Sequence, residues 1–469
     1  MAPVSESPTE PLSEPPAEPI VAPARGISSG ELLRKATHMS VGLIALALRF
    51  LGPLWSLVLA AAALAFNLLL LPRIGGKRMW REHEVAAGGA AGIVFYPLAV
   101  LLLILVFYRR LEIAAGAWGI LAFGDGMASI AGMTLGRAKL PWNPRKSWAG
   151  SAAYVVCGAL ACAFLLRWTA PGRYELGFAL AIAAAAALFA AALESLPNGL
   201  DDNLGVPLVS GLFLLGLALT QGRWEALVEG GLARRLLIGA AINAALAAAA
   251  YLARTVDLSG VAAGFLLGTA IYGLLGWRGY LLLLGFFVLG SAATKAGYRR
   301  KAAARLAQEK GGRRGARHAL ANSGVAAACA LFAAATPYPR LFALAFAAAF
   351  ATAAADTCSS EIGQLLGRRT FLLTTLRPVP RGTEGAVSLE GTLAGVLATL
   401  AIGALGAAVG LYPWWGAAAI AVAAFVGTIS ESLAGAALES RGLLDNEALN
   451  FLNTLVGALS AAALAPLVG

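Results

Sequence analysis

The chain has 469 residues, of which 59% are hydrophobic and only 13% are charged, and its mean hydropathy is +0.74. This composition excludes an ordinary soluble protein and predicts a polytopic membrane protein. The net charge is +11, and in a membrane protein the positions of Lys and Arg set the orientation in the bilayer. With only three histidines, a histidine-based metal site is not expected. The spacing of the four cysteines indicates small buried side chains rather than disulfides or metal ligands.

The first 28 residues are expected to form a disordered cytosolic tail. They place Glu6, Glu10, Glu14 and Glu18 among prolines, serines and alanines, with too few apolar residues to fold. They also lack the basic start and apolar core of a signal peptide.

Apolar segments near the length needed to cross a bilayer follow along the rest of the chain. They lie at residues 37–52, 54–72, 87–107, 111–133, 148–167, 177–195, 203–220, 233–252, 257–276, 279–297, 319–336, 340–358, 388–411, 413–437 and 448–468. We therefore expect an all-α polytopic membrane protein with about 14–15 transmembrane helices.

The distribution of Lys and Arg predicts that the N-terminus faces the cytosol. If the loops alternate from that start, most of the cations lie on the inner side, as the positive-inside rule requires. The same topology places on the cytosolic side the loops that hold Lys146, Asp202, Arg313, Arg381 and Asp445. A multi-pass protein of a prokaryotic cell membrane, with its functional residues on the cytosolic side, is the expected location.

A repeat is the strongest internal signal. Its first part is the spacing of Asp125, Ser129, Gly132 and Gly136, which returns in Asp356, Ser360, Gly363 and Gly367. Its second part is Ser147-x-x-Gly150-Ser151, which returns as Ser388-x-x-Gly391-Thr392. Its third part is Glu194-Ser195-Leu196 before Asp202-Asn203, which returns as Glu431-Ser432-Leu433 before Asp445-Asn446. We expect two diverged copies of one unit, at residues 29–222 and 223–469.

Asp125 and Asp356 stand at the edge of apolar segments, each on a small, polar helix face. An acidic residue in a membrane segment costs about 2.5–3.5 kcal/mol on insertion scales, so packing alone does not explain it. Both aspartates are predicted to bind Mg²⁺ or nucleotide phosphate. The glycines beside them also fit the small-xxx-small pattern of close helix packing, and both interpretations stay open for them.

A second acidic group follows in each copy. The first consists of Glu194, Asp201 and Asp202 with Asn203, and the second of Glu431, Asp445 and Glu447 with Asn446. Two carboxylate groups per copy suit a metal-bound triphosphate, or a metal ligand together with a base that orients an attacking hydroxyl. The alternative is a solvated acidic loop.

Cations and a helix start complete the predicted phosphate site. Lys146 precedes Ser147, a predicted N-cap whose helix exposes its first amides, a common arrangement for binding phosphate. Residues 295–317 are rich in Lys and Arg. They fit an anchor with affinity for anionic lipid headgroups, or a phosphate-gripping turn around GGRRG, and nucleic acid is not an expected partner.

The helix before the first span carries Glu31, Arg34, Lys35 and His38 on one face. These side chains fit an interfacial charge network or a part of the functional site, and the sequence leaves both open.

Several motifs of the first half resemble the phytol kinase branch of the polyprenol kinases, relatives of dolichol kinase. The matching residues are Glu31-x2-Arg34-Lys35-x2-His38, Gly124-Asp125-Gly126-x-Ala128, residues 140–151 (LPWNPRKSWAGS) and Glu194-x2-Pro197-x3-Asp201-Asp202-Asn203. The resemblance covers about residues 28–220 and implies phosphorylation of a long isoprenoid alcohol with CTP as the donor.

The second half resembles a different membrane family, long without known function, that includes a plant phytyl-phosphate kinase. The matching residues are residues 311–315 (GGRRG), Ala321-Asn322, Ala355-Asp356-Thr357, Ser360-Glu361-x-Gly363, residues 382–388, Gly391-Thr392 and residues 444–453. Val387 stands where the first half has Lys146. A phosphate-binding cation of the second half is therefore expected from Arg381 or Arg377.

Together these features predict a bifunctional lipid kinase that converts an isoprenoid alcohol to its monophosphate and then to its diphosphate. The expected catalytic residues are Asp125, Lys146, Asp202, Asp356, Glu361 and Asp445. The expected CTP-binding residues are Ser129, Gly132, Ser147, Gly150, Ser151, Arg313, Arg314, Asn322, Arg381, Gly382, Thr383, Ser388, Gly391 and Thr392. The expected Mg²⁺ ligands are Asp125, Glu194, Asp201, Asp202, Asp356, Glu431, Asp445 and Glu447.

Two other functions fit the same residues. A cytidylyltransferase would transfer CMP from CTP onto a lipid phosphate and would use similar acidic side chains. A transporter built from two repeats is the alternative that is not an enzyme, although repeats of the same orientation fit it less well than inverted ones.

Overall fold

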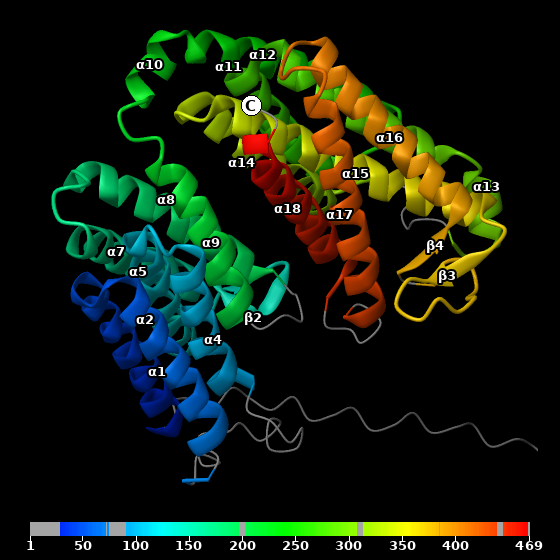
Figure 1. The fold of residues 1–469 in the computed structure, drawn as a ribbon. Coiled ribbons are helices and arrows are strands. Elements are labelled where there is room, and N and C mark those ends of the chain that lie inside the picture. Colours follow the sequence, from blue (N-terminus) through cyan, green and yellow to red (C-terminus); the bar gives the residue numbers. More distant parts are fainter. Residues whose placement is uncertain are drawn as a thin grey trace, which may run out of the picture.

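The computed structural model describes residues 29–71, 73–74, 91–196, 202–306, 313–383, 385–438 and 444–467, and helices dominate this part of the chain (Figure 1). The tail expected over residues 1–28 lies outside the described residues, as do Asp201, which was expected to bind metal, and Glu384.

The first half contributes a series of helices interrupted by one short hairpin. In chain order its elements are α1 (Ser29–Gly42), η1 (Leu43–Ala47), α2 (Leu48–Ala65), η2 (Phe66–Leu70), α4 (Ala91–Val106), α5 (Leu111–Gly119), η4 (Ile120–Asp125), α6 (Gly126–Leu135), β1 (Lys139–Leu140), β2 (Asn143–Ser147), α7 (Trp148–Thr169), α8 (Leu176–Ser195) and α9 (Asp202–Ala218).

The second half ends, like the first, with a helix, a hairpin and three further helices. Its elements are α10 (Trp224–Glu229), α11 (Leu232–Leu252), α12 (Leu258–Lys295), α13 (Tyr298–Ala303), α14 (Ala316–Ala335), α15 (Pro339–Leu366), β3 (Thr370–Leu372), β4 (Ala386–Ser388), α16 (Leu389–Ala408), α17 (Gly416–Ala437), α18 (Asn446–Leu464) and η7 (Ala465–Leu467). Both hairpins are antiparallel, and each joins a helix that carries an aspartate to a helix that starts with a serine cap.

Within the described residues, eleven helices are long and apolar enough to cross a membrane, and two shorter apolar helices accompany them. Two of the eleven break at glycines, Gly52 in α2 and Gly276 in α12, each with φ of 65°. Glycine reaches this region without steric cost, so each long element consists of two consecutive helices. The breaks lie where the sequence predicts one span to end and the next to begin. The all-α polytopic fold is confirmed.

The helices form two groups that lie side by side in Figure 1, each around its own hydrophobic core. The centre of one core is α5 with η4, and the centre of the other is α15, which is buried from Ala343 through Ala355. Alanine dominates this buried stretch, so the surrounding helices approach it closely. Phe332 of α14 joins the core of the first group, where it packs 5.7 Å from the ring of Phe213. The domain boundary at residue 222 stays a prediction.

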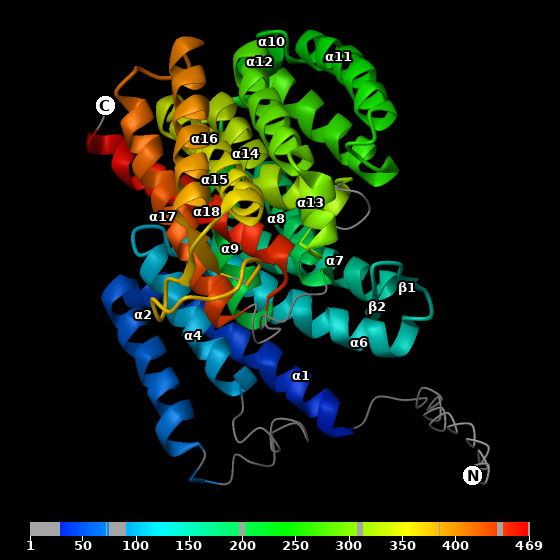
Figure 2. The same ribbon diagram turned by 90° about the vertical axis from the view of Figure 1, so that its right-hand side faces the viewer.

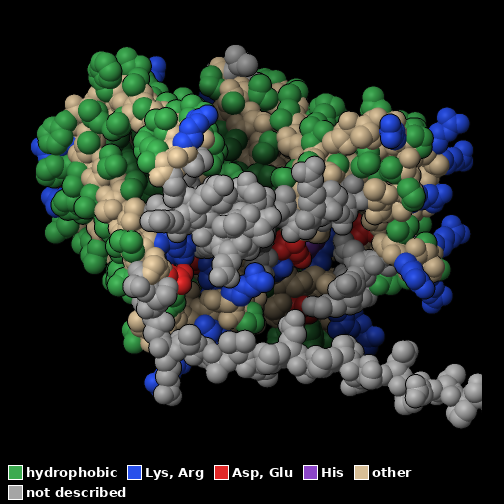
Figure 3. All heavy atoms as spheres, turned by 90° about the horizontal axis from the view of Figure 1, so that it is seen from below, with side chains coloured by type: hydrophobic (Ala, Val, Ile, Leu, Met, Phe, Trp, Pro, Cys, Tyr) green, Lys and Arg blue, Asp and Glu red, His purple; other side chains and the backbone are tan. Residues whose placement is uncertain are grey.

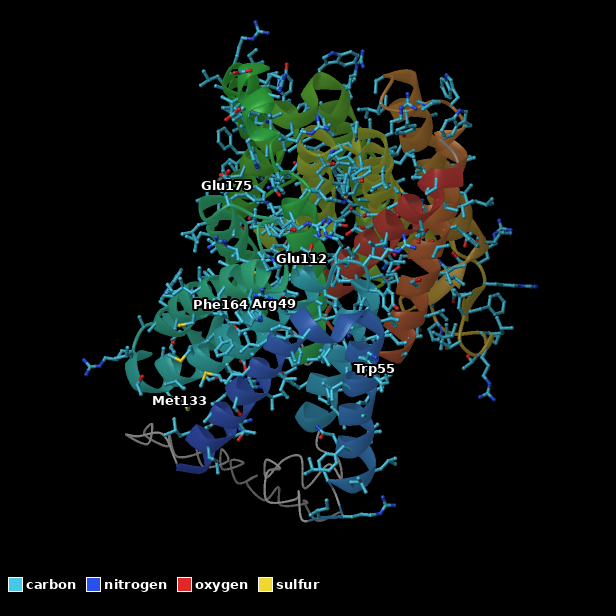
Figure 4. All side chains as sticks on the ribbon, turned by 60° about the vertical axis from the view of Figure 1, so that its left-hand side comes forward. Arg49, Trp55, Glu112, Met133, Phe164 and Glu175 are labelled. Atoms are coloured by element: carbon cyan, nitrogen blue, oxygen red, sulfur yellow. The ribbon has the colours of Figure 1, made fainter. Side chains whose placement is uncertain are left out.

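The far end of α7 marks the side of the bilayer opposite the hairpin. There Arg49 lies 4.7 Å from the ring centre of Trp168, and Phe164 stacks on the same ring, as Figure 4 illustrates with Arg49 and Phe164 side by side. At this end Glu112 is buried and accepts a hydrogen bond of 2.6 Å from Arg110. The 22 residues of α7 rise about 33 Å, close to the thickness of a bilayer core. The hairpin and the Arg49–Trp168 contact are therefore separated by a distance that would place one at each membrane interface.

Candidate functional site

Asp125 ends the η4 segment, and two side chains of α1 face it. The Nζ atom of Lys35 donates a hydrogen bond of 2.8 Å to its Oδ2 atom, and Nε2 of His38 lies 3.6 Å from the same oxygen. The Asp125 side chain is still 22% exposed. On the α1 face, Lys35 and His38 therefore lie next to Asp125, while Arg34 pairs with Glu31.

Small residues allow α1 to approach this closely. A Cβ atom added at Gly126 would lie 2.5 Å from the Met39 side chain, and one added at Gly42 would lie 2.3 Å from Ala122. His38 adds a polar contact of 3.2 Å to the carbonyl oxygen of Leu121. The glycines thus place the ammonium of Lys35 against Asp125.

Lys146, at the end of the hairpin, joins the second acidic group. It contacts the carboxylate of Glu194 and lies 3.4 Å from Oδ2 of Asp202. Burial disfavours the charged amine, but the two carboxylates outweigh this effect and raise the pKa of Lys146 above its ordinary value. Lys146 is therefore a permanent cation between the end of α8 and the start of α9.

The hairpin is fastened to α8 next to Glu194. Asn143 is buried and donates a hydrogen bond of 3.0 Å to the carbonyl oxygen of Ser195, and Trp142 donates one of 3.2 Å to the Ser195 hydroxyl. These bonds explain why Lys146 reaches Glu194.

Asp125 and the second acidic group of the first half lie close enough to interact electrostatically. Asp125 interacts electrostatically with both Lys146 and Asp202. The buried phenol of Tyr154, on α7, lies within the electrostatic range of Asp125, Glu194 and Asp202. Sequence reasoning missed Tyr154, and its only signal is a polar ring on an otherwise apolar helix.

Ser147 caps α7 as the sequence predicts. Its Oγ atom accepts a hydrogen bond of 3.2 Å from the amide of Gly150. Gly132 and Gly136 leave room for this hydroxyl, because an added Cβ would lie 3.4 Å or 2.7 Å from it. These two glycines therefore pack the cap against α6. Ser129 and Ser151 lie half-buried on α6 and α7.

A cavity of about 520 Å³ opens beside Asp125 between α1, α2, η2 and α4. Lys35, His38 and Asn203 line its polar end. Most of the other lining side chains are apolar, among them Leu48, Leu59, Ala60, Phe66, Val100 and Ile104, and Arg34, Thr37, Ser56 and Asn67 complete the lining. The cavity is therefore shaped for an apolar molecule with one polar end.

In the second half, Asp356 has an acidic neighbour instead of a lysine. Its carboxyl group hydrogen-bonds to that of Glu431, on α17, and Ser360 lies 3.5 Å away. Glu361 is buried and contacts Lys301, which also donates to the carbonyl oxygens of Ala293 and Thr294. Glu361 is thus held in place by Lys301.

The serine cap of the second half repeats the first in detail. Ser388 has φ and ψ of −133° and 156°, against −134° and 153° for Ser147. Its Oγ atom accepts a hydrogen bond of 3.1 Å from the amide of Gly391. The sequence repeat is therefore a repeat of backbone geometry at this cap.

Asp445 also caps a helix, since its Oδ1 atom accepts a hydrogen bond of 2.9 Å from the amide of Ala448 in α18. The guanidinium of Arg317, on α14, contacts Asp445 and lies 3.8 Å from Glu447. Sequence reasoning placed Arg317 in a basic segment but gave it no partner, because α14 and α18 are distant in the chain.

Other residues expected to bind CTP are more scattered. Arg381 is exposed in the β3–β4 connection, and Arg313 is exposed before α14. Arg314 is buried beside Thr294, at 3.3 Å, and Asn322 is buried and donates to the carbonyl oxygen of His318. Two of these four residues are therefore exposed and two are buried.

A cavity of about 750 Å³ accompanies the second group. Its lining includes Asp356, Ser360, Glu361, Glu431, Asn446 and Asn450. It also includes Gly382, Thr383, Ser388, Gly391 and Thr392 of the predicted phosphate site. Most of the residues expected in the second copy therefore face one space.

The acidic groups differ in how well they fit a divalent metal. Among the described residues, no group of three or more His, Cys, Asp and Glu side chains is arranged to hold a metal ion. In the first half, Asp125, Glu194 and Asp202 already contact lysines. In the second half, the Asp356–Glu431 carboxyl pair faces the cavity, a donor set that suits Mg²⁺ bound together with phosphates.

Both groups lie on the same face of the molecule. Figure 2 shows α6 and the first hairpin next to each other beside α7, and Figure 1 shows the first hairpin beside the lower end of α9 and the second hairpin at the lower right of its helix group. Seen from below, Lys, Arg, Asp and Glu side chains gather between flanks of hydrophobic side chains (Figure 3). One polar face thus carries both candidate sites.

Comparisons with known proteins agree with these motifs. Residues 241–458 match the family described as integral membrane protein DUF92. Over 197 residues, 41% of this chain and 76% of the relative, the chain is 45% identical to the uncharacterized membrane protein sll0875 of Synechocystis sp.. It is 38% identical over 210 residues to Protein VTE6, chloroplastic, of Arabidopsis thaliana, which covers 43% of this chain and 63% of that protein.

A third relative carries an activity in its name. The chain is 33% identical over 209 residues to the probable phytol kinase 2, chloroplastic, of Oryza sativa subsp. japonica, which covers 41% of this chain and 67% of that protein. No solved structure matches the chain. The family resemblances drawn from the motifs are confirmed by these relatives.

Proposed function

Because this chain belongs to the DUF92 family of integral membrane proteins and has a phytol kinase among its relatives, we propose that it is a bifunctional membrane kinase of isoprenoid alcohols. The first half phosphorylates phytol or a similar alcohol, and the second half phosphorylates the resulting monophosphate. CTP is the donor in both steps, and both sites face the cytosol.

The observation that carries this proposal is the pairing of charge and cavity in the first half. Lys35, at the polar end of an apolar cavity, contacts Asp125, and Lys146, beside the capped start of α7, interacts electrostatically with the same carboxylate. A long alcohol fits the cavity with its hydroxyl toward Lys35 and His38. The γ-phosphate of the nucleotide then lies near Lys146 and the first amides of α7, where cations and a helix start stabilise phosphate charge.

The first reaction is a direct phosphoryl transfer. The hydroxyl oxygen of the alcohol forms a bond to the γ-phosphorus, the bond from this phosphorus to the β–γ bridging oxygen breaks, and CDP leaves. Asp125 accepts the hydroxyl proton, and Lys35 holds its carboxylate in place. Because phosphoryl transfer depends mainly on positioning and on charge neutralisation, Lys146 contributes most by holding the donor phosphates.

In the second reaction a phosphate oxygen of the monophosphate forms a bond to the γ-phosphorus of another CTP, the bond from this phosphorus to the β–γ bridging oxygen breaks, and CDP leaves. The Asp356–Glu431 pair would hold Mg²⁺, because two carboxyl groups at hydrogen-bonding distance cannot both ionise without a counter-charge. When bound, this ion neutralises phosphate charge. Gly391 and Thr392, at the start of α16, hold the donor phosphates, and Lys301 keeps Glu361 in its orientation.

The test uses the full chain in liposomes with phytol and CTP labelled either in the γ-phosphate or in the cytosine. Label from the γ-phosphate is expected in a lipid monophosphate and then in a diphosphate. Cytosine label in the lipid would instead show a cytidylyltransferase. A protein that consumes no CTP with any prenol but moves a solute across the liposome would be a transporter.

A further inference from the structure

In the second half Arg317 contacts Asp445, as Lys146 contacts Asp202 in the first half. We propose, on the basis of the bifunctional kinase above, that Arg317 is the residue that positions the donor phosphates in the second site. The cation has moved from the hairpin to α14, where the sequence repeat does not reveal it.

The backbone is the same at the two serine caps. Ser147 and Ser388 agree within a few degrees in φ and ψ, and Lys146 and Val387 directly precede them. Lys146 reaches Asp202 at the start of α9. Val387 lines the second cavity but carries no charge, so the second site lacks a cation at this position.

The acidic partners of the two cations occupy equivalent positions of the repeat. Asp445 is the repeat counterpart of Asp202, and both lie where the last helix of their half begins. Lys146 contacts Asp202, and Arg317 contacts Asp445. Both halves therefore have a contact between a cation and this aspartate. The cation comes from β2 in the first half and from α14 in the second.

Arg317 and Lys146 are both partly exposed. The Arg317 side chain is 41% exposed, close to the 30% of Lys146. Arg317 adjoins His318, which lines the second cavity, and its partner Asp445 adjoins Asn446, which lines it too. Its planar fork of donors suits two phosphate oxygens at once.

The other cations near the second site have different positions. Lys301 is fully buried and donates to Glu361 and to two carbonyl oxygens. Arg314 is buried beside Thr294 and the ring of Phe286, and it interacts electrostatically with Glu361 and Asp356. Arg377 and Arg381 are exposed in the β3–β4 connection, and among the described residues neither pairs with a carboxylate as Arg317 pairs with Asp445.

The experiment is a rescue by moving the charge. In the full chain in liposomes, Arg317→Gln is expected to lower kcat/KM for CTP in the second step by about tenfold to a hundredfold, mainly through KM. Monophosphate formation by the same molecules is expected to stay at the wild-type rate, which shows that the protein is folded. Adding Val387→Lys to Arg317→Gln is expected to restore most of the second step, whereas Val387→Met is expected to restore none.

Other results would contradict either the role of Arg317 or the proposed function. A second step that is unchanged by Arg317→Gln, or that Val387→Lys does not restore while monophosphate formation is normal, would overturn the role of Arg317. If the wild type makes no diphosphate, the proposed function fails instead, and CTP binding by equilibrium dialysis then decides about Arg317. Wild type should bind two CTP, and Arg317→Gln should weaken one of these sites unless Val387→Lys is present.

Discussion

Lys35 and Asp125 are 90 residues apart in the chain, yet the ammonium of one donates a hydrogen bond of 2.8 Å to the carboxylate of the other. The contact joins the first helix of the chain to the end of the buried central helix of its half. It gives Asp125 a fixed orientation beside the apolar cavity. Removing the lysine would leave a carboxylate without its main counter-charge in a mostly apolar setting.

Lys35→Gln is therefore expected to abolish monophosphate formation and to destabilise the protein by about 3 kcal/mol, the range found when one partner of a buried ion pair is removed. Thermal unfolding in detergent, together with the phytol assay, measures both effects. Arg34→Gln is the matched control, because Arg34 forms a more exposed pair with Glu31 on the same helix. An equal loss of stability in both variants would contradict the role of the Lys35–Asp125 contact.

The two aspartates of the repeat are expected to control separate steps. Asp125→Asn should abolish monophosphate formation from phytol but leave diphosphate formation from added monophosphate. Asp356→Asn should make the monophosphate accumulate, since the first site is intact. Mass spectrometry of the lipid products distinguishes these outcomes, and an equal loss of both steps from either variant would indicate one shared site.

Much of the fold could be predicted from the sequence because its signals are local. Apolar runs give the spans, glycines mark the breaks in α2 and α12, and the repeated Ser-x-x-Gly pattern gives the caps of α7 and α16. The contacts that complete the sites could not be predicted in this way. Helical spacing places Lys35 and His38 on one face of α1 but does not say what that face meets, and nothing local connects Arg317 with Asp445, 128 residues away.

The charge of Lys146 is expected to persist over the whole working range of pH. Its pKa in the folded protein lies above the ordinary value of 10.5, because Glu194 and Asp202 outweigh the effect of burial. A raised pKa means that the stabilisation is complete below the ordinary pKa and is lost only as the pH rises through the higher folded value.

Lys146→Arg should therefore give the same pH profile of monophosphate formation as the wild type from about pH 7 to about pH 10, while Lys146→Gln should lower the rate at every pH in that range. The measurement is the initial rate at saturating phytol. A basic limb that moves to higher pH in Lys146→Arg would show that Lys146 loses its proton in this range, against the raised pKa.

The cavity between α1, α2 and α4 is expected to select the length of the alcohol. Ala60 is buried and lines this cavity, whereas Ala62, two residues further along α2, is exposed on the outer surface of the helix. Ala60→Phe fills part of the space and should raise KM for phytol by about tenfold, which corresponds to about 1.4 kcal/mol of lost binding, with little change in KM for CTP. A shorter prenol should be affected less, because it leaves the deep part of the cavity empty. Ala62→Phe adds the same side chain on the lipid-facing side and should change neither value, so a similar rise in KM for phytol in both variants would place the alcohol elsewhere.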